Sequence, residues 1–462
     1  RQSFLVTQDI QPRLRRLAQA GKLGGLEDID LWIGGLAEKK MAFGGMLGST
    51  FSFIFELQLE NLQNADRFYY LSRVQGLNLL NELENNSLAK MVLANSDLGE
   101  SGYAVPGDIF SVPDHVLYTD MAMQSKFHHQ DPSHNDIYLE MLSKMVERRD
   151  ADGNLIDPAD PDYLTSVAAY IRVNSNDHFL IQGTNGAETI IAGGGDDAVW
   201  GMAGNDRIEA GYGVDKIHGG KGDDIIVNSG TDIGEVDMLH GEEGNDVMHG
   251  GSGLALVFGN QGQDFIMTGP DGKEVFGGTG NDFILGGEGG DFLLGNEGDD
   301  WMEGGNGFDA IAGDNSELFF NSSIIGHDVM FAGQNEQDFD AESGDDIMVQ
   351  GASVMRNEGM WGFDWAIHKG SAAAADADLL RPIFTTDEQD ILRNRYDAVE
   401  ALSGWDKNDA IKGDNRGTAA DGEEPEVTPG LAGAEGTMAR HELTQAGVDR
   451  IAGMRALLGD WA

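Results

Sequence analysis

The sequence predicts an α+β multidomain protein, with a mainly helical N-terminal segment, a parallel β-roll and a mixed C-terminal region. Three observations lead to this prediction. Apolar residues near the N-terminus recur at spacings of three and four, a nine-residue repeat runs from about residue 190 to about residue 312, and glycine becomes scarce after residue 370. We expect four parts: a helical segment at 1–150, a linker at 151–182, the roll with degenerate end repeats at 183–368, and helices with a flexible loop at 369–462.

The helical prediction for the first 150 residues depends on amphipathic spacing. Apolar residues fall on one face of segments 51–63 and 69–93, and 136–146 is a further candidate helix. Residues 150–161 are polar and contain two Asp-Pro steps, which favour a linker over a regular element. Near the C-terminus, Thr385 and Thr386 precede a predicted helix, residues 413–436 read as a loop, and a final helix is expected from about 438 to 458.

The composition limits the possible functions. The chain has 462 residues, a formal net charge of −49 and no cysteine. The acidic side chains of such a chain repel one another unless cations neutralise them. The negative charge also excludes binding to nucleic-acid phosphates, because that binding requires a basic surface. The absence of cysteine excludes disulfides and thiolate metal sites. No stretch is long and apolar enough to predict a membrane span.

Aspartate recurs every nine residues in two phased blocks of four and nine repeats, joined by a four-residue insertion. An apolar residue stands two residues after the aspartate position of each repeat, and a glycine usually stands two residues before the aspartate position. Ala255 and Lys273 replace aspartate at two positions of the second block. The candidate metal ligands are Asp197, Asp206, Asp215, Asp224, Asp237, Asp246, Asp264, Asp282, Asp291, Asp300 and Asp309. A flexible glycine-rich linker would not keep apolar residues and aspartates in phase.

Each position of the repeat has a physical role. Glycine permits positive φ and lets backbone carbonyls approach an ion, while aspartate supplies a hard anionic oxygen. Ca²⁺ takes about six to eight such oxygens at ~2.3–2.6 Å. Two repeats would form one turn of a parallel roll, and aspartates on turns stacked ~4.8 Å apart repel by about 1 kcal/mol per pair even in water. We therefore expect several calcium ions and a roll that folds only with calcium. Asp328, Asp346, Asp364 and Asp409 are out of register and are either degraded repeats or capping turns.

Segments 219–227 (GGKGDDIIV) and 277–285 (GGTGNDFIL) resemble the GGxGxDxUx nonapeptide of haemolysin-type RTX calcium-binding repeats. This resemblance implies a secreted protein, at the cell surface or outside the cell, which folds after export. A type I secretion apparatus is a possible partner. The closing helix could belong to a C-terminal export signal or lead into a further domain.

Residues 26–38 (LEDIDLWIGGLAE), 44–59 (GGMLGSTFSFIFELQL) and 62–70 (LQNADRFYY) resemble the C-terminal end of the animal haem peroxidase domain. The arrangement is similar to large bacterial proteins in which such a domain precedes RTX repeats. The resemblance implies haem and peroxidase activity in the parent protein. The family's haem-binding and catalytic His and Arg precede the DIDLxxGG stretch, so we expect this chain alone to be inactive and assign it no catalytic or haem-binding residue.

The sequence therefore supports two hypotheses. The first is the calcium-binding RTX module of a secreted bacterial haem peroxidase, with calcium ions and the rest of the peroxidase domain as partners. The second is a non-enzymatic, calcium-dependent adhesion or surface-structural module. The sequence has neither an HExxH zinc-protease motif nor a GxSxG motif, and His115, His128, His129 and His134 read as surface or loop residues.

Overall fold

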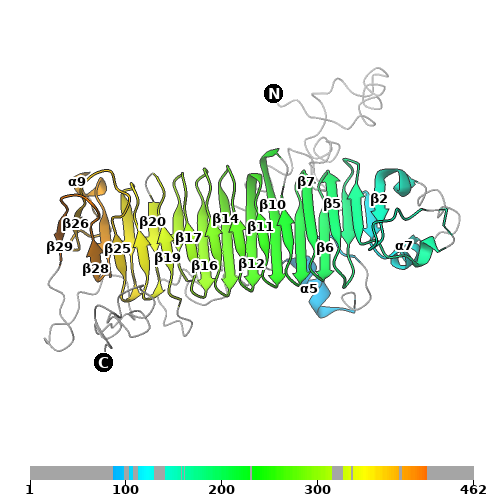
Figure 1. Ribbon diagram of the computed structural model, residues 1–462, viewed down its shortest axis with the longest axis horizontal. Coiled ribbons are helices and arrows are strands. Elements are labelled where there is room, and N and C mark those ends of the chain that lie inside the picture. The colour runs from blue at the N-terminus through cyan, green and yellow to red at the C-terminus, as the bar shows by residue number, and fades with distance from the viewer. Residues whose placement is uncertain are drawn as a thin grey trace, which may run out of the picture.

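A computed structural model describes most of the chain after residue 86. The described ranges are 87–97, 104–107, 113–128, 141–314 and 326–413, except for 158, 161, 229–230, 335–336, 384 and 386–387. These residues form an elongated parallel β-solenoid in which strands stack side by side along the long axis (Figure 1).

Two sheets form the walls of the solenoid. Sheet I has 12 strands: β1 (His115–Tyr118), β4 (Phe179–Gln182), β6 (Ala198–Ala203), β8 (Lys216–Lys221), β10 (Thr231–Glu243), β12 (Ser252–Gln261), β14 (Lys273–Thr279), β16 (Phe292–Glu297), β18 (Ala310–Ala312), β20 (Gln337–Asp340), β23 (Met355–Glu358) and β27 (Arg395–Asp397). Sheet II has 13 strands: β2 (Val146–Arg149), β3 (Tyr170–Val173), β5 (Thr189–Gly194), β7 (Arg207–Tyr212), β9 (Ile225–Val227), β11 (Val247–His249), β13 (Phe265–Met267), β15 (Phe283–Leu285), β17 (Trp301–Glu303), β19 (Val329–Phe331), β22 (Ile347–Val349), β25 (Trp365–Ile367) and β28 (Ala401–Ser403).

Smaller elements complete the described part of the chain. Two short parallel pairs join β21 (Ser343–Gly344) to β24 (Trp361–Gly362) and β26 (Asp376–Asp378) to β29 (Ala410–Lys412). Helices include α5 (Leu88–Asn95), α7 (Met121–His128), α9 (Glu388–Ile391) and the 3₁₀ turn η3 (Tyr163–Thr165), and residues 141–145 are also helical. Within the two sheets, β2 and β3 pair antiparallel and the other strand pairs are parallel. The sheets therefore run the length of the solenoid with one strand contributed by each turn.

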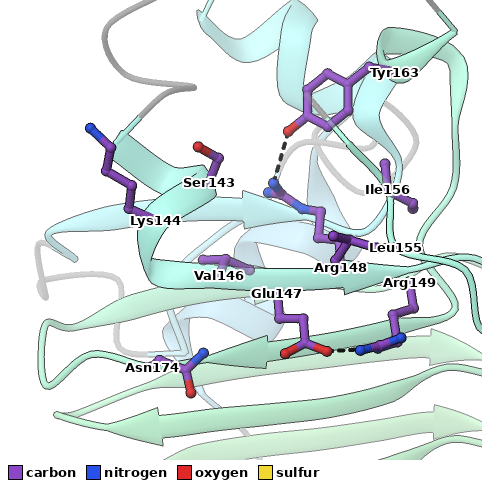
Figure 2. Close-up of a pocket in the computed structure, with 10 residues that line it drawn as sticks. All are labelled: Ser143, Lys144, Val146, Glu147, Arg148, Arg149, Leu155, Ile156, Tyr163 and Asn174. Atoms are coloured by element: carbon purple, nitrogen blue, oxygen red, sulfur yellow. Dashed lines mark hydrogen bonds and ion pairs between the residues drawn. The ribbon is translucent and has the colours of Figure 1, made fainter. Parts of the chain in front are cut away.

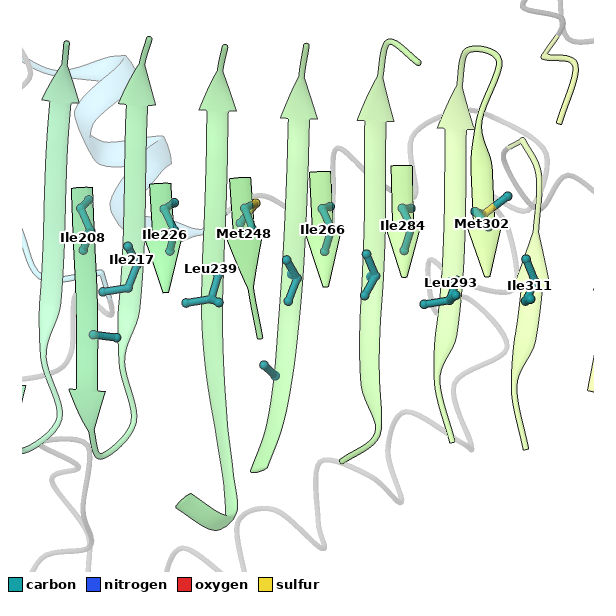
Figure 3. Close-up of a cluster of buried hydrophobic side chains, with 14 of the residues drawn as sticks. Ile208, Ile217, Ile226, Leu239, Met248, Ile266, Ile284, Leu293, Met302 and Ile311 are labelled. Carbon is teal, nitrogen blue, oxygen red and sulfur yellow. The ribbon is translucent and has the colours of Figure 1, made fainter. Parts of the chain in front are cut away.

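The core is a column of apolar side chains between the two sheets (Figure 3). In sheet II, Ile266 aligns with Ile284 and Ile284 with Met302, each one turn of 18 residues further on. The repeat residues predicted to point inward have at most 1% of their surface exposed, which confirms that part of the sequence analysis: Val199, Ile208, Ile217, Ile226, Leu239, Met248, Val257, Ile266, Val275, Ile284, Leu293, Met302 and Ile311.

Glycine is required where the chain turns between the sheets. Gly262 and Gly280 have φ of +140° and +132°, a region that L side chains rarely adopt. A β-carbon at Gly280 would also collide with the carbonyl oxygen of Gly262 on the preceding turn. The glycine that stands two residues before most of the aspartates therefore permits both the turn and the close stacking.

The predicted α+β class is wrong for the described residues, in which strands predominate and helices are few and short. Within the helix predicted at 136–146, residues 141–145 are helical, Val146 begins β2, and 136–140 lie outside the described residues. The range predicted as a linker contains β3 and β4. The helix predicted after Thr385 is only the four-residue α9, and the short strands β26 to β29 also lie in the C-terminal region. The physical reason is that short segments at the ends of the solenoid form hydrogen bonds with its neighbouring strands. The spacing of apolar residues within such a segment does not reveal this pairing. The predicted helices at 51–63 and 438–458 lie outside the described residues.

Candidate calcium-binding rows

Aspartates line one edge of the solenoid as a continuous row, called here the long row. Each member directly precedes a strand of sheet II, and its Oδ1 accepts a hydrogen bond of 2.6–3.1 Å from the backbone N–H of the corresponding residue one turn earlier. Glu188 donates its N–H to the first member, and Glu400 accepts from the last. The members are Asp206, Asp224, Asp246, Asp264, Asp282, Asp300, Asp328, Asp346 and Asp364.

The second carboxylate oxygens of this row are buried without a protein donor. The carboxylates are at most 3% exposed, and the Oδ2 atoms of eight members accept no hydrogen bond: Asp206, Asp224, Asp246, Asp264, Asp282, Asp300, Asp328 and Asp364. A buried, unsatisfied carboxylate oxygen is costly, because it has lost its hydration without replacement. The arrangement therefore requires a cation, or protonation, to become stable.

Backbone carbonyls meet the unpartnered carboxylate oxygens. A methyl group added to Gly259 would collide with Asp264 Oδ2 and with the carbonyl oxygen of Gly277 on the next turn. The same holds at Gly277, where Asp282 Oδ2 and the Gly295 carbonyl oxygen converge. Among the described residues, no group of three or more His, Asp or Glu side chains is arranged to hold a metal. Carboxylate and carbonyl oxygens are the donors that Ca²⁺ prefers.

Burial changes the protonation of the row. Loss of water raises the pKa of Asp264 and Asp282 to about 7 and that of Asp246 and Asp300 to about 8. Repulsion from neighbouring aspartates adds to the rise at Asp246, Asp264 and Asp300. The row thus holds its negative charge poorly when no cation balances it, and a divalent ion would remove this penalty.

The opposite edge carries a second, interrupted row, called here the short row. Its members are Asp197, Asp215, Asp237, Asp291 and Asp309, which precede or lie in strands of sheet I. Their Oδ1 atoms accept backbone N–H bonds of 2.7–2.9 Å in the same way as those of the long row. Between Asp237 and Asp291 the positions belong to Ala255 and Lys273. The structure therefore divides the eleven predicted ligands into six on the long row and five on the short row.

Three members of the long row are among the out-of-register aspartates that the sequence left open as degraded repeats or capping turns and that were not predicted as ligands. Asp328, Asp346 and Asp364 continue it, although the 28 residues between Asp300 and Asp328 break the nine-residue frame. The signal that could have found them is the apolar residue two positions later, because Met330, Met348 and Ala366 are fully buried.

Part of the N-terminal region packs on the outer face of sheet I. Trp200 Nε1 donates to the Val105 carbonyl at 2.8 Å, and Lys90 of α5 pairs with Glu242 at 3.3 Å. Beside these contacts a column of rings stacks at centroid distances of 3.8, 4.7 and 4.8 Å, formed by Trp200, His218, His240 and Phe258. The rings occupy the same place in successive turns, which is the sequence signal that could have predicted them.

The histidines singled out from the sequence do not form a site in the described part. His115 lies in β1, where it is 3.6 Å from Asp177 and packs against Phe179, so its interpretation as a surface or loop residue is wrong. His128 ends α7, and His129 and His134 lie outside the described residues.

A pocket of about 320 Å³ lies at the β2 end of the solenoid (Figure 2). Arg148 donates to the Tyr163 hydroxyl at 3.2 Å there, and Glu147 pairs with Arg149 at 2.7 Å. These contacts join neighbouring segments at this end of the solenoid. The aspartate rows are the stronger candidate site.

Comparison with protein families agrees with this geometry. The model of the RTX calcium-binding nonapeptide repeat matches four copies, at 182–211, 200–230, 234–266 and 276–311. The model of the animal haem peroxidase matches residues 7–110. The chain thus contains a segment similar to part of an animal haem peroxidase domain, followed by repeats similar to the RTX nonapeptide. The RTX repeats imply calcium binding, and the peroxidase family implies haem.

Curated relatives match the peroxidase part. Chorion peroxidase of Drosophila melanogaster is 38% identical over 78 residues, covering 15% of this chain and 9% of the relative. Heme peroxidase 2 of Caenorhabditis elegans is 40% identical over 76 residues, covering 15% and 10%. Peroxidasin homolog pxn-1 of the same organism is 32% identical over 94 residues, covering 20% and 7%. The chain thus spans about a tenth or less of these relatives. In the part of the chain that the structure describes, no helix is long and apolar enough to cross a membrane.

Proposed function

We propose that this chain is the calcium-binding module of a secreted haem peroxidase family protein, and that calcium drives the folding of its RTX roll. The observation that carries the proposal is the long row of buried aspartates with unpartnered Oδ2 atoms. Their stacking brings like charges to within ~4.8 Å of each other, and ions held between turns would convert this repulsion into crosslinks.

The proposed ligands are the long-row carboxylates together with the carbonyl oxygens of the adjoining glycine loops. Gly259 and Gly277 illustrate why no larger residue fits, because a side chain there would occupy the space where these oxygens converge. Bound calcium ions would neutralise part of the formal net charge of −49 that the chain carries. Each ion joins consecutive turns, so binding and folding are coupled.

Secretion follows from the calcium levels that such a module needs. Extracellular calcium modules bind at ~0.1–1 mM, far more weakly than cytosolic buffers. The roll would remain unfolded where calcium is scarce and fold outside the cell, which suits a secretion apparatus that exports unfolded chains. The peroxidase-matched residues Lys90 and Val105 contact the roll, so the folded roll would also support the end of the peroxidase domain.

Calcium titration followed by circular dichroism tests the proposal. The chain freed of calcium by a chelating resin is expected to lack most of its β-signal and to gain it cooperatively by ~10 mM calcium. Magnesium at the same concentration is the control, because the smaller Mg²⁺ ion keeps its coordinated water and binds poorly to sites that are rich in carbonyl oxygens. A β-signal that is complete without calcium would contradict the proposal.

A further inference from the structure

The centre of the short row contains a buried lysine where the repeat calls for aspartate. Lys273 is 3% exposed, and its Nζ donates to the carbonyl oxygen of Gly253 and, at 2.9 Å, to that of Asp271. Gly253 lies at the start of β12 and Asp271 lies just before β14, one turn further along the same edge. The ammonium group therefore bridges two stacked turns through backbone carbonyl oxygens, as an ion between those turns would.

The aliphatic part of the Lys273 side chain occupies the position on the short row that corresponds to the position of an aspartate Oδ2 on the long row. A methyl group added to Gly241 or Gly259, which open long-row loops, would collide with the Oδ2 of Asp246 or Asp264. At the equivalent Gly250 of the short row, the atoms near such a methyl group include Lys273 Cε at 3.0 Å and Cδ at 3.4 Å. Lysine and calcium would thus compete for this place.

The aspartates on either side of this stretch already have protein donors. Asn228 Nδ2 donates to Asp237 Oδ2, while Asp291 Oδ2 accepts from Gly287 N–H at 3.0 Å and from Thr268 Oγ1 at 3.3 Å. Asn228 and Thr268 stand at the loop position that is glycine in most long-row repeats. This differs from the eight long-row members whose Oδ2 atoms accept no hydrogen bond.

The charges agree with the hydrogen bonds. The positions 237, 255, 273 and 291 would carry four negative charges if all were aspartate. Here two aspartates and one lysine leave a formal charge of −1. Lys273 also interacts electrostatically with Asp271, Asp291 and Asp237. A divalent ion has little left to neutralise in this stretch.

We propose that Lys273, with Asn228 and Thr268, replaces calcium in the centre of the short row, so that the loops between residues 228 and 291 on this edge are held without metal. This inference rests on the proposed calcium binding of the long row. It makes the two edges unequal, and it removes Asp237 and Asp291 from the set of calcium ligands.

Counting bound calcium tests the proposal directly. Equilibrium dialysis with radioactive calcium at ~10 mM is applied to the full chain, to Lys273→Asp and to Asp264→Asn. Lys273→Asp restores the repeat and is expected to bind at least one more ion per chain than the original sequence. Asp264→Asn, on the long row, is expected to bind at least one fewer. A folded Lys273→Asp variant with an unchanged ion count would overturn the inference.

A second variant covers the case in which Lys273→Asp does not fold. Lys273→Met keeps the stem without the charge and is expected to lower the unfolding midpoint in saturating calcium by about 5 °C or more. Lys221→Met, at an exposed lysine paired with Glu243, is the matched control and should leave the midpoint unchanged. Equal midpoints for the two variants would overturn the inference. Failure of the proposed function would look different, because neither the original chain nor Asp264→Asn would bind calcium.

Discussion

Changing Asp264, Asp282 and Asp300 together to asparagine is expected to raise the calcium concentration needed for folding by at least tenfold. These aspartates are consecutive members of the long row, are at most 3% exposed, and have Oδ2 atoms without a protein donor. Asparagine keeps the size and the Oδ1 acceptor but removes the charge that binds a divalent ion. A tenfold shift corresponds to about 1.4 kcal/mol, which is modest for three lost anionic ligands. The midpoint of a calcium titration monitored by circular dichroism gives the measurement.

The matched control changes three exposed aspartates to asparagine. Asp152, Asp157 and Asp160 lie at the surface and none of them contributes to the pKa shifts of Asp264, Asp282 or Asp300, so their replacement removes the same formal charge without affecting the buried oxygens. The control is expected to shift the calcium midpoint by less than about twofold, because exposed charges are screened by solvent and salt. Equal shifts for the two triple variants would mean that overall charge, and not the long row, sets the calcium requirement.

In calcium-free buffer the roll is expected to become less stable as the pH rises from about 4 to about 8. Burial raises the pKa of Asp224 to about 6, those of Asp264 and Asp282 to about 7 and that of Asp300 to about 8, from 3.8, so the folded state holds protons that the unfolded state has released. Stability falls with pH wherever the folded state binds more protons, and this contribution is lost above the folded pKa values. Circular dichroism of the chelator-treated chain at pH 5, 6.5 and 8 provides the test, and the β-signal is expected to be largest at pH 5, where protonation replaces the missing cations.

Two features sharpen this pH test. Burial lowers the pKa of His218 and His240, which favours unfolding below pH 6.5, but the buried aspartates outnumber these histidines. With calcium present the dependence should reverse, because ions bind the charged carboxylates and binding releases protons up to about pH 8. A calcium-free chain that grows steadily more stable from pH 5 to pH 8 would contradict the assignment of these burial effects.

The fold of the roll could be predicted from the sequence because its rules are local. An apolar residue two positions after each aspartate must point inward, and Ile266 and Ile284 do so. The nine-residue period places alternate aspartates on opposite edges, since one turn takes two repeats. Helices near both ends were predicted less well. Segments such as His115–Tyr118 and Val146–Arg149 have no repeat of their own, and they become strands by pairing with Phe179–Gln182 and Tyr170–Val173.

By itself the sequence determined the period, the inward apolar residues and the aspartates that could bind a cation. Only the tertiary structure decided which aspartate oxygens lack a partner. Asn228 Nδ2 reaches Asp237 Oδ2, and Lys273 Nζ reaches the carbonyl of Gly253, from residues 9 and 20 positions away. Such contacts depend on how loops stack between turns, which residue spacing within one loop does not specify. The long row, by contrast, has eight buried oxygens without a protein donor, because its loops open on residues with no donor side chain.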